Sequence, residues 1–286
     1  MRLALFDDYR LGVVTGDGVV DVTDALPWPH DPDPLSAGWW RRLCRDFADV
    51  REALEKAAEL GRPVRPARLL APALNPSKIV ASASNYADHV AEMHDVQERT
   101  LGGVVSWMFD FDVFLKAPSS ISGPQDDIVL PDAVVAAGQE IHHESELVVV
   151  IGAGGKDIPE ESALDHVVGY TLGLDITVRS AADRSRRKSY DTFSPLGPYL
   201  VTADEVGDPA GLDIRLSVNG EERQAVHTST MITKVPAIVA YASSMMTLLP
   251  GDLLFTGAPP GVGPIHRGDV LDTGISRIGT MRLTVR

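Results

Sequence analysis

Short runs of apolar residues, bounded by glycine, proline, aspartate and asparagine, recur along almost the whole chain. Such runs are typical of β-strands, whose side chains alternate between two faces. The first residues show the pattern clearly, with apolar stretches at residues 2–6, 11–14 and 18–22 separated by turn-forming residues. An Asn219-Gly220 dipeptide further on predicts a tight hairpin. We therefore expect an α+β fold that is rich in strands, with a curled or barrel-like core.

Helical periodicity is confined to a few segments. Apolar residues recur at three- and four-residue steps between residues 37 and 60, where Gly61 ends the predicted helix. Further helices are expected at residues 85–93, 159–168 and 235–249.

A proline-rich stretch divides the chain. Residues 62–76 contain several prolines, a composition typical of linkers. We place a domain boundary near residue 70, which separates a small N-terminal β/α domain at residues 1–68 from a larger domain at residues 69–286. Strands of the larger domain are expected at residues 78–84, 127–131 and 168–179, among others.

The strand from His142 to Gly152 is the most informative, because it carries two carboxylates near its start. Glu144 and Glu146 lie two residues apart, so they project from the same face. Two carboxylates at the mouth of a buried strand repel each other, and a divalent cation would offset both charges. The alternative is a solvated strand end that binds nothing.

A third carboxylate supports the metal hypothesis. Asp175 lies among apolar residues of a predicted strand, and a buried carboxylate needs a partner. Arg179 is one candidate partner, and a cation shared with Glu144 and Glu146 is the other. Three carboxylates form an oxygen-only site suited to Mg²⁺, Mn²⁺ or Ca²⁺. His142 lies on the same strand face and could add a nitrogen ligand, which would favour Mn²⁺ or Zn²⁺.

A histidine and a glutamate form a second candidate pair. His89 and Glu92 are three residues apart in a predicted helix, so their side chains are neighbours on one helix face. A carboxylate beside an imidazole fixes its tautomer and supports its protonated form, as a general base requires. The pair follows a predicted strand directly, where the sites of α/β proteins gather. A surface contact without function is the alternative.

Residues 94–113 combine a polar beginning, a Gly102-Gly103 break and an aromatic-rich apolar stretch. We interpret this segment as a mobile flap with a hydrophobic tip, or as a loop packed on a neighbouring subunit.

The composition of the chain restricts the classes of partner and the compartment that we expect for the protein. The chain has 286 residues, of which 44% are hydrophobic, with a net charge of -14 and a pI near 4.9. No basic patch follows the chain, which argues against a nucleic-acid partner. The single cysteine, Cys44, excludes an intrachain disulfide and is consistent with a reducing compartment. Without a signal-like N-terminus or a run of about 18 apolar residues, we expect a cytoplasmic protein that does not enter a membrane.

Ordered motifs identify the chain as similar to the fumarylacetoacetate hydrolase family, in its small bacterial form. The resemblance covers about residue 70 to the C-terminus, and the first 60 residues look like the small β-rich N-terminal domain that many members carry. The matching motifs lie at residues 85–89, 114–120, 144–152, 169–179, 188–193, 195–198, 218–221, 250–252 and 256–263.

The resemblance implies a mixed β-sandwich roll and a homodimer that uses Mg²⁺ or Mn²⁺, with Ca²⁺ as a further candidate. It implies that Glu144, Glu146 and Asp175 bind the metal. His89 and Glu92 fall on a dyad that activates water on a lid helix, and Lys188 falls on a lysine that reaches a developing oxyanion. The implied substrate contacts are Tyr86, Arg179, Gly257 and Ala258.

The chemistry implied by the resemblance starts from an oxo acid that chelates the metal. The metal and Lys188 stabilise the enolate that remains when a C–C bond breaks. With water delivered by His89 and Glu92, the result is hydrolysis of an acylpyruvate- or fumarylpyruvate-type diketo acid, as in the breakdown of aromatic compounds. Without water attack, the same stabilisation serves decarboxylation or isomerisation of an oxo-diacid, such as oxaloacetate or 2-hydroxyhepta-2,4-diene-1,7-dioate.

Two positions depart from the family pattern. Many members carry glutamine where this chain has Ala182 and threonine where it has Ala258. The basic run from Arg184 to Arg187 is also atypical. One interpretation is neutral drift that keeps the backbone contacts. The other is a changed substrate, larger or more anionic, with arginines replacing the lost hydrogen bonds.

Overall fold

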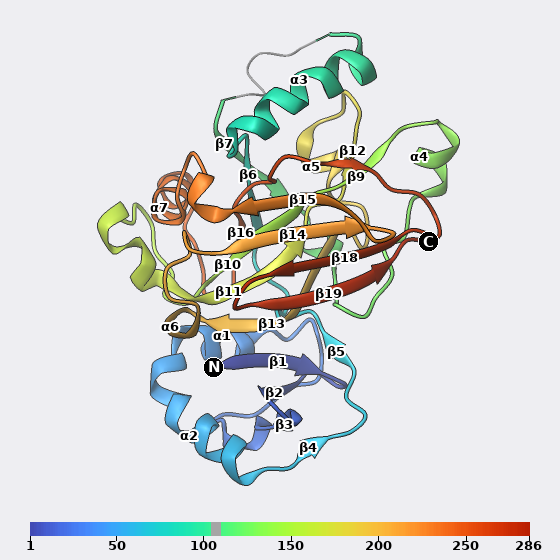
Figure 1. Cartoon of the computed structure of the whole chain (residues 1–286). Coiled ribbons are helices and arrows are strands. Elements are labelled where there is room, and N and C mark those ends of the chain that lie inside the picture. The colour runs from blue at the N-terminus through green and yellow to red at the C-terminus, as the bar shows by residue number, and fades with distance from the viewer. Residues whose placement is uncertain (104–109) are drawn as a thin grey trace.

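The computed structural model describes residues 1–103 and 110–286, which form three β-sheets with helices around them (Figure 1). The largest sheet has twelve strands. Its main path runs through β4 (Pro63–Val64), β3 (Gly18–Asp21), β2 (Arg10–Thr15), β1 (Arg2–Phe6), β13 (Ser194–Thr202), β11 (Val167–Leu174), β10 (Ser145–Ile151), β16 (Leu253–Phe255), β6 (Ile79–Ala83) and β7 (Asp112–Lys116). Beside this path, β5 (Leu69–Leu70) pairs with β1, and β8 (Ile121–Ser122) pairs with β13.

Two smaller sheets complete the strand-rich fold. One has the order β12 (Thr177–Val178), β9 (Ile141–His143) and β17 (Gly263–Pro264). The other has the order β15 (Glu221–His227), β14 (Asp213–Val218), β18 (Val270–Ile275) and β19 (Gly279–Thr284). The predicted Asn219-Gly220 hairpin joins β14 to β15. The expected α+β fold with many strands is confirmed.

Strand β10 lies in the middle of the large sheet, and every one of its residues is buried. Side chains alternate along it, so its two faces enter different parts of the core. Leu147, Val149 and Ile151 belong to one hydrophobic cluster. Val148 and Val150 belong to a second cluster, which also contains Leu3 and Leu5 from the N-terminal strand β1. Because both faces of β10 are buried, its residues 147–151 are apolar without alternation.

Two neighbouring segments of the chain pass from the twelve-stranded sheet into the three-stranded sheet at the same place, which forms a corner between the sheets. Strand β10 pairs with β11, and β9 pairs with β12, but the two pairs belong to different sheets. Glu144 stands between β9 and β10, and Asp175 stands just after β11. The Asp175 N–H donates to the Glu144 carbonyl oxygen over 2.8 Å. Two predicted strands are therefore wrong in one respect each: the strand from His142 to Gly152 is interrupted at Glu144, and the strand at residues 168–179 is interrupted at Asp175 and Ile176.

The N-terminal helical segment is two helices rather than one. Helix α1 (Gly38–Arg45) and helix α2 (Phe47–Leu60) meet at Asp46, whose backbone has φ -105 and ψ 21. Both helices bury apolar side chains in the same cluster as β1, so the apolar spacing continues across the break. That continuity is why the pattern predicted a single helix over residues 37–60.

The N-terminal strands are hydrogen-bonded to the rest of the fold. Arg2 pairs with Val201 and Leu3 with Leu200, so β1 joins the large sheet through β13. The division into domains at residues 1–68 and 69–286 stays a prediction.

Helix α3 (Ala87–Leu101) is longer than the predicted helix at residues 85–93. Its second half occupies residues 94–101, which were expected to begin a flap. Residues 94–101 contain good helix formers, and Gly102, with a left-handed φ of +69, ends the helix. Residues 104–109 of the predicted flap lie outside the described residues.

Three further segments differ from their predictions in extent. Residues 160–166 form a 3₁₀ helix, η4, within the helix predicted at 159–168. Helix α7 (Val235–Met245) ends four residues before the predicted residue 249. Within residues 127–131, Ile128 makes only an isolated bridge with Val285, so the predicted strand is wrong. The short helices α4 (Asp132–Ala136), α5 (Arg184–Arg187) and α6 (Ala203–Val206) complete the described α-helices.

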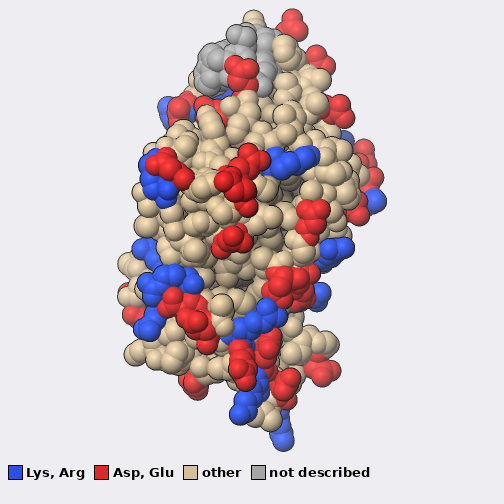
Figure 2. Space-filling model, turned by 90° about the vertical axis from the view of Figure 1, so that its left-hand side faces the viewer, with Lys and Arg blue, Asp and Glu red and all other residues tan. Residues whose placement is uncertain are grey.

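Figure 2 shows acidic and basic side chains interspersed over one face of the molecule. Within the described parts of the chain, no helix is both long and apolar enough to cross a membrane.

Candidate active site

Glu144, Glu146 and Asp175 form a buried group at the corner between the sheets, which we call the carboxylate cluster. Their exposed fractions are 3%, 1% and 1%. One carboxylate oxygen from each residue lies within 4.8 Å of the other two. The structure therefore brings together the three carboxylates that the sequence placed in one metal site.

Three cationic side chains surround this cluster. The Lys188 ammonium donates to Glu144 Oε2 at 2.8 Å, to Asp175 Oδ2 at 2.5 Å and to Thr177 Oγ1 at 2.7 Å. Arg179 donates to Glu144 Oε1 at 2.5 Å. Lys116 donates to Asp175 Oδ1 at 2.6 Å. Glu144 and Asp175 therefore each have two positively charged partners.

Glu146 is in a different electrostatic position. Among residues 1–103 and 110–286 it makes no ion pair, and its Oε2 accepts a hydrogen bond from the Gly257 N–H at 2.6 Å. Burial raises the pKa of Glu146 well above its usual range, and the negative charges of Asp175 and Glu144 raise it further. Burial also disfavours the ionised form of Glu144, but Lys188 and Arg179 outweigh it and hold the pKa of Glu144 well below its usual range. A divalent cation would relieve the repulsion on Glu146, so this donor set fits such an ion.

Two glycines bring the loop after β16 close to the site. Gly257 has a φ of +100, and a Cβ there would lie 2.7 Å from the Asn85 Cβ. Gly261 has a φ of +90, and a Cβ there would lie 1.8 Å from the Arg223 carbonyl oxygen. Only glycine meets both demands at these positions. Their N–H groups can therefore reach the carboxylates of Glu146 and Glu92.

The His89–Glu92 pair forms on α3 as predicted. His89 Nδ1 lies 3.2 Å from Glu92 Oε2. Glu92 is fixed in turn, because its Oε2 accepts a hydrogen bond from the Gly261 N–H at 3.1 Å. His89 is 7% exposed and 27% of the Glu92 side chain is exposed, so the histidine of the pair is buried.

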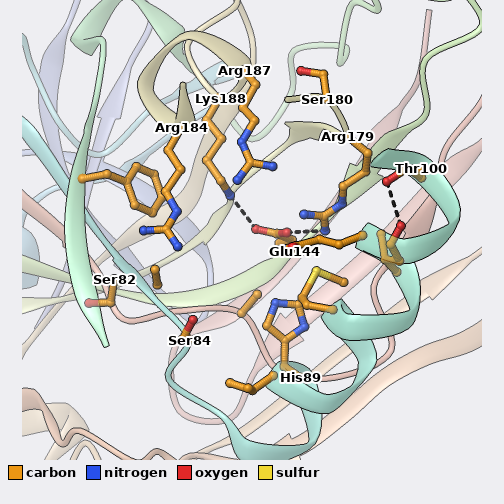
Figure 3. A pocket seen from close by; sticks show the side chains of 17 residues that line it. Ser82, Ser84, His89, Thr100, Glu144, Arg179, Ser180, Arg184, Arg187 and Lys188 are labelled. Atoms are coloured by element: carbon orange, nitrogen blue, oxygen red, sulfur yellow. Dashed lines mark hydrogen bonds and ion pairs between the residues drawn. The ribbon is translucent and has the colours of Figure 1, made fainter. Parts of the chain in front are cut away.

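A cavity joins the histidine to the carboxylate cluster (Figure 3). His89 reaches it from α3 on one side, while Lys188 and Arg179 reach toward Glu144 from the other. The cavity is lined by four further groups of interest, Ser82, Ala258, Arg184 and Arg187. The dyad histidine and one member of the carboxylate cluster therefore face the same space.

The other predicted substrate contacts lie at different depths. Arg179 and Ala258 line the cavity. Gly257 is not among the residues lining the cavity, and its N–H donates to Glu146 instead. Tyr86 is 2% exposed, and its hydroxyl has no hydrogen-bond partner among the described residues. Ala182 is half-buried and is not among the residues lining the cavity.

His142 is not part of the carboxylate cluster. Its Nε2 lies 2.8 Å from Glu140 Oε2, and its Nδ1 has no partner within the described part of the chain. Burial, and then the positive charge of Arg179, lower the pKa of His142 to about 4. The imidazole therefore stays neutral beside the cluster at neutral pH.

Lys116 is a site residue that sequence reasoning missed. It lies in a motif used for the family resemblance, but no role was assigned to it. Its side chain is fully buried against Asp175. A lone lysine at the end of an apolar strand is the signal that could have identified it, because buried lysines need a carboxylate partner.

The family is shown by comparison with known sequences. Residues 78–286 match the fumarylacetoacetate (FAA) hydrolase C-terminal family. The chain is 39% identical over 292 residues to the maleylpyruvate hydrolase of Aquipseudomonas alcaligenes, and the match covers 100% of this chain and 99% of that protein. This protein belongs to the fumarylacetoacetate hydrolase family, as its motifs predicted.

Solved structures agree with this assignment. A maleylpyruvate hydrolase from Sphingobium sp. SYK-6, crystallised with manganese(II) and pyruvate, superimposes with a TM-score of 0.85 at 40% identity, covering 100% of this chain and 98% of that one. A 2-hydroxyhepta-2,4-diene-1,7-dioate isomerase from Mycobacterium marinum superimposes with a TM-score of 0.73 at 32% identity, covering 100% and 98%. The expected fold and the expectation of an enzyme of this family are both confirmed.

Proposed function

We propose that this protein is a divalent-cation-dependent hydrolase that cleaves a C–C bond in a diketo acid of the acylpyruvate or fumarylpyruvate type, as part of aromatic-compound breakdown. The observation that carries the proposal is one cavity lined by both His89 and Glu144. The resemblance to two maleylpyruvate hydrolases over the full chain supports the same reaction.

Glu144, Glu146 and Asp175 would hold the cation, Mg²⁺ or Mn²⁺, with Ca²⁺ as a further candidate. When bound, such a cation supplies Lewis-acid stabilisation of the negative charge that develops on substrate oxygens. Mn²⁺ has the more direct support, because the related Sphingobium enzyme was crystallised with it.

His89 takes the proton from the attacking water. Its Nδ1 is held by Glu92, which leaves Nε2 to face the cavity and act as the base. The water oxygen bonds to the acyl carbonyl carbon, and the adjacent C–C bond then breaks. The electron pair of that bond passes to the pyruvyl fragment as an enolate, which takes up a proton to become pyruvate.

Lys188 contributes positive charge beside the developing oxyanion. Its ammonium has three N–H groups, and each has an acceptor in the structure, on Glu144, Asp175 and Thr177. Donation to a substrate oxygen therefore requires one of these bonds to be exchanged. Among the predicted substrate contacts, Arg179 and Ala258 would touch the substrate from the cavity wall, while Tyr86 and Gly257 would support it from behind.

The test is hydrolysis of fumarylpyruvate and acetylpyruvate, followed by loss of their enol absorbance and by enzymatic detection of pyruvate. We expect equimolar pyruvate and carboxylic acid, and no turnover after chelation. His89→Ala should remove hydrolysis but keep Mn²⁺ binding in calorimetry, whereas Glu146→Ala should remove both. Loss of Mn²⁺ binding in His89→Ala, together with retained Mn²⁺ binding in Glu146→Ala, would contradict these roles.

An isomerase or decarboxylase of the same family is the second candidate. The similarity to a 2-hydroxyhepta-2,4-diene-1,7-dioate isomerase favours it, and the His89–Glu92 pair could move a proton without adding water. Incubation with oxaloacetate and with the dienedioate separates the two. Release of CO₂ or a shifted spectrum, without cleavage of diketo acids, would select this alternative.

We also propose that the protein is a cytoplasmic homodimer. The family resemblance supports the dimer, and the single buried cysteine, Cys44, suits a reducing compartment. Light scattering after gel filtration tests the first, and cell fractionation tests the second.

A further inference from the structure

Two arginines that the proposed mechanism does not use face the cavity. Arg184 and Arg187 begin and end the short helix α5, and both belong to the cavity wall. They are three residues apart, which places them on one side of a helical turn. Figure 3 shows both guanidinium groups on the same side of the cavity as the Lys188 ammonium. Arg186, which stands between them, is exposed instead.

Arg187 makes no ion pair within the described residues. Its Nε is buried without a hydrogen-bond partner among them. Burial, and then the positive charge of Arg179, lower the pKa of Arg187 to about 10. Glu144 and Asp175 act on this guanidinium only through their charge, so it has donors to spare for a ligand.

Arg184 is buried beside an aromatic ring. It is 9% exposed, and its guanidinium carbon lies 5.9 Å from the centroid of the Phe114 ring. Asp112, Asp183 and Glu144 act on it electrostatically. The cation–π contact with the ring restrains the position of the guanidinium at the cavity wall.

The charges around the cavity do not balance. Lys188 and Arg179 face the cavity but are paired with Glu144, and Asp112 and Asp183 act on Arg184. Arg187 adds a positive charge that makes no ion pair within the described ranges, and a divalent cation would add two more. The carboxylate of a 2-oxo acid compensates for only one of these charges. The excess favours a ligand with a second anionic group.

We propose that Arg187, with Arg184 beside it, binds a second carboxylate at the far end of the acyl chain, so that the site selects dicarboxylic diketo acids over acylpyruvates with an uncharged acyl group. A planar guanidinium donates two parallel hydrogen bonds to a carboxylate, which suits this role. The inference rests on the proposed hydrolase function and specifies its substrate class.

Steady-state kinetics with Mn²⁺ test the proposal, using fumarylpyruvate as the dicarboxylic substrate and acetylpyruvate as the uncharged comparison. Arg187→Met should lower kcat/KM for fumarylpyruvate about 10- to 100-fold, the range for one charge-assisted interaction, mainly through KM. Acetylpyruvate turnover should change less than about threefold, because it makes no such contact. Arg184→Met should act in the same direction, and Arg187→Lys should keep part of the preference.

Arg186→Met is the matched control, because Arg186 is an exposed arginine of the same helix, and it should alter neither substrate. Equal loss on both substrates in Arg187→Met, or no preference in the wild type, overturns the proposal. If the wild type cleaves neither compound, the proposed function fails, and calorimetry with fumarate then decides the arginine assignment. Binding that is lost in Arg187→Met supports the assignment, whereas unchanged binding overturns it.

Discussion

At the residue scale, Glu146 is the most informative member of the carboxylate cluster. Glu144 and Asp175 have lysine and arginine partners, but Glu146 has a backbone N–H and two neighbouring negative charges. An isolated buried carboxylate is costly, so this position favours either a protonated side chain or a bound cation.

We expect Glu146→Gln to separate metal binding from folding. The amide keeps the shape and the bond from Gly257 but removes a charge, so the metal-free variant should be at least as stable as the wild type. Mn²⁺ should raise the melting temperature of the wild type, because a ligand that binds only the folded state stabilises it. The variant should show little or no such rise. A rise equal to that of the wild type would contradict the assigned ligand.

Lys116 is a structural counterpart on the same cluster. Its ammonium bonds Asp175 at 2.6 Å and the Phe193 carbonyl oxygen at 2.8 Å. Burial lowers the pKa of Lys116, and the negative charge of Asp175 opposes that effect.

Lys116→Met should destabilise the protein through loss of a buried ion pair. The expected fall in the free energy of unfolding is about 3 kcal/mol, because removing one partner of a buried pair leaves the other uncompensated. Denaturation with urea measures it. Lys156→Met is the control, since the ion pair of Lys156 with Asp157 lies at the surface, with 41% of the lysine side chain exposed, and its loss should cost less than about 1 kcal/mol. Equal effects of the two substitutions would contradict the structural role.

At the element scale, α3 carries the dyad and contacts two segments that adjoin strands, the loop before β17 and the residue before β9. Near its beginning, Glu92 accepts from the Gly261 N–H. Near its end, Arg99 donates to both carboxylate oxygens of Glu140, one of them at 3.0 Å. Glu140 also contacts His142, in the strand that leads to the carboxylate cluster. The position of the helix over the cavity therefore depends on contacts beyond the dyad itself.

The Arg99–Glu140 pair should contribute to stability in a pH-dependent way. The side-chain bond from Arg99 is the largest influence and, against partial burial, brings the pKa of Glu140 down from 4.5 to about 2. The contribution is therefore complete above pH 4.5 and is lost as the pH falls toward 2. A double-mutant cycle with Arg99→Ala and Glu140→Gln should give up to about 1 kcal/mol at pH 7 and less at pH 3. A coupling free energy that does not decrease at low pH would rule out this pair as its source.

At the scale of the whole molecule, one sheet connects the N-terminal strands to the site. Strand β1 pairs with β13, which pairs with β11, which pairs with β10. The second hydrophobic cluster contains Leu5 as well as Val148 and Val150, on either side of the proposed domain boundary. The two parts therefore share a core as well as hydrogen bonds.

Residues 69–286 expressed without residues 1–68 should be much less stable than the whole chain. The truncation exposes one edge of β13 and the apolar face of β10 that Leu3 and Leu5 help to cover. Circular dichroism melting measures the loss, and coexpression of residues 1–68 should restore part of it. A fragment that melts at the same temperature as the whole chain would instead support two independent domains.

The chemistry of the site was largely predictable from the sequence, and its electrostatics were not. Spacing of two residues put Glu144 and Glu146 together, and spacing of three put His89 beside Glu92. The motifs identified the family. The pairing of Lys116 with Asp175, which lies 59 residues further on, follows from no local pattern. Likewise, the single predicted helix over residues 37–60 concealed the break at Asp46, because both helices pack on one core.

The sequence by itself determined which side chains are available, because residue type and local periodicity depend only on neighbours in the chain. The tertiary structure decided which of them meet. Glu144 and Asp175 share a corner because two paired strands bend there from one sheet into another, and no pattern in the chain marked that bend. It also decided that Glu146 makes no ion pair among the described residues and that Arg187 faces the cavity, since burial and charge balance arise only when distant segments pack together.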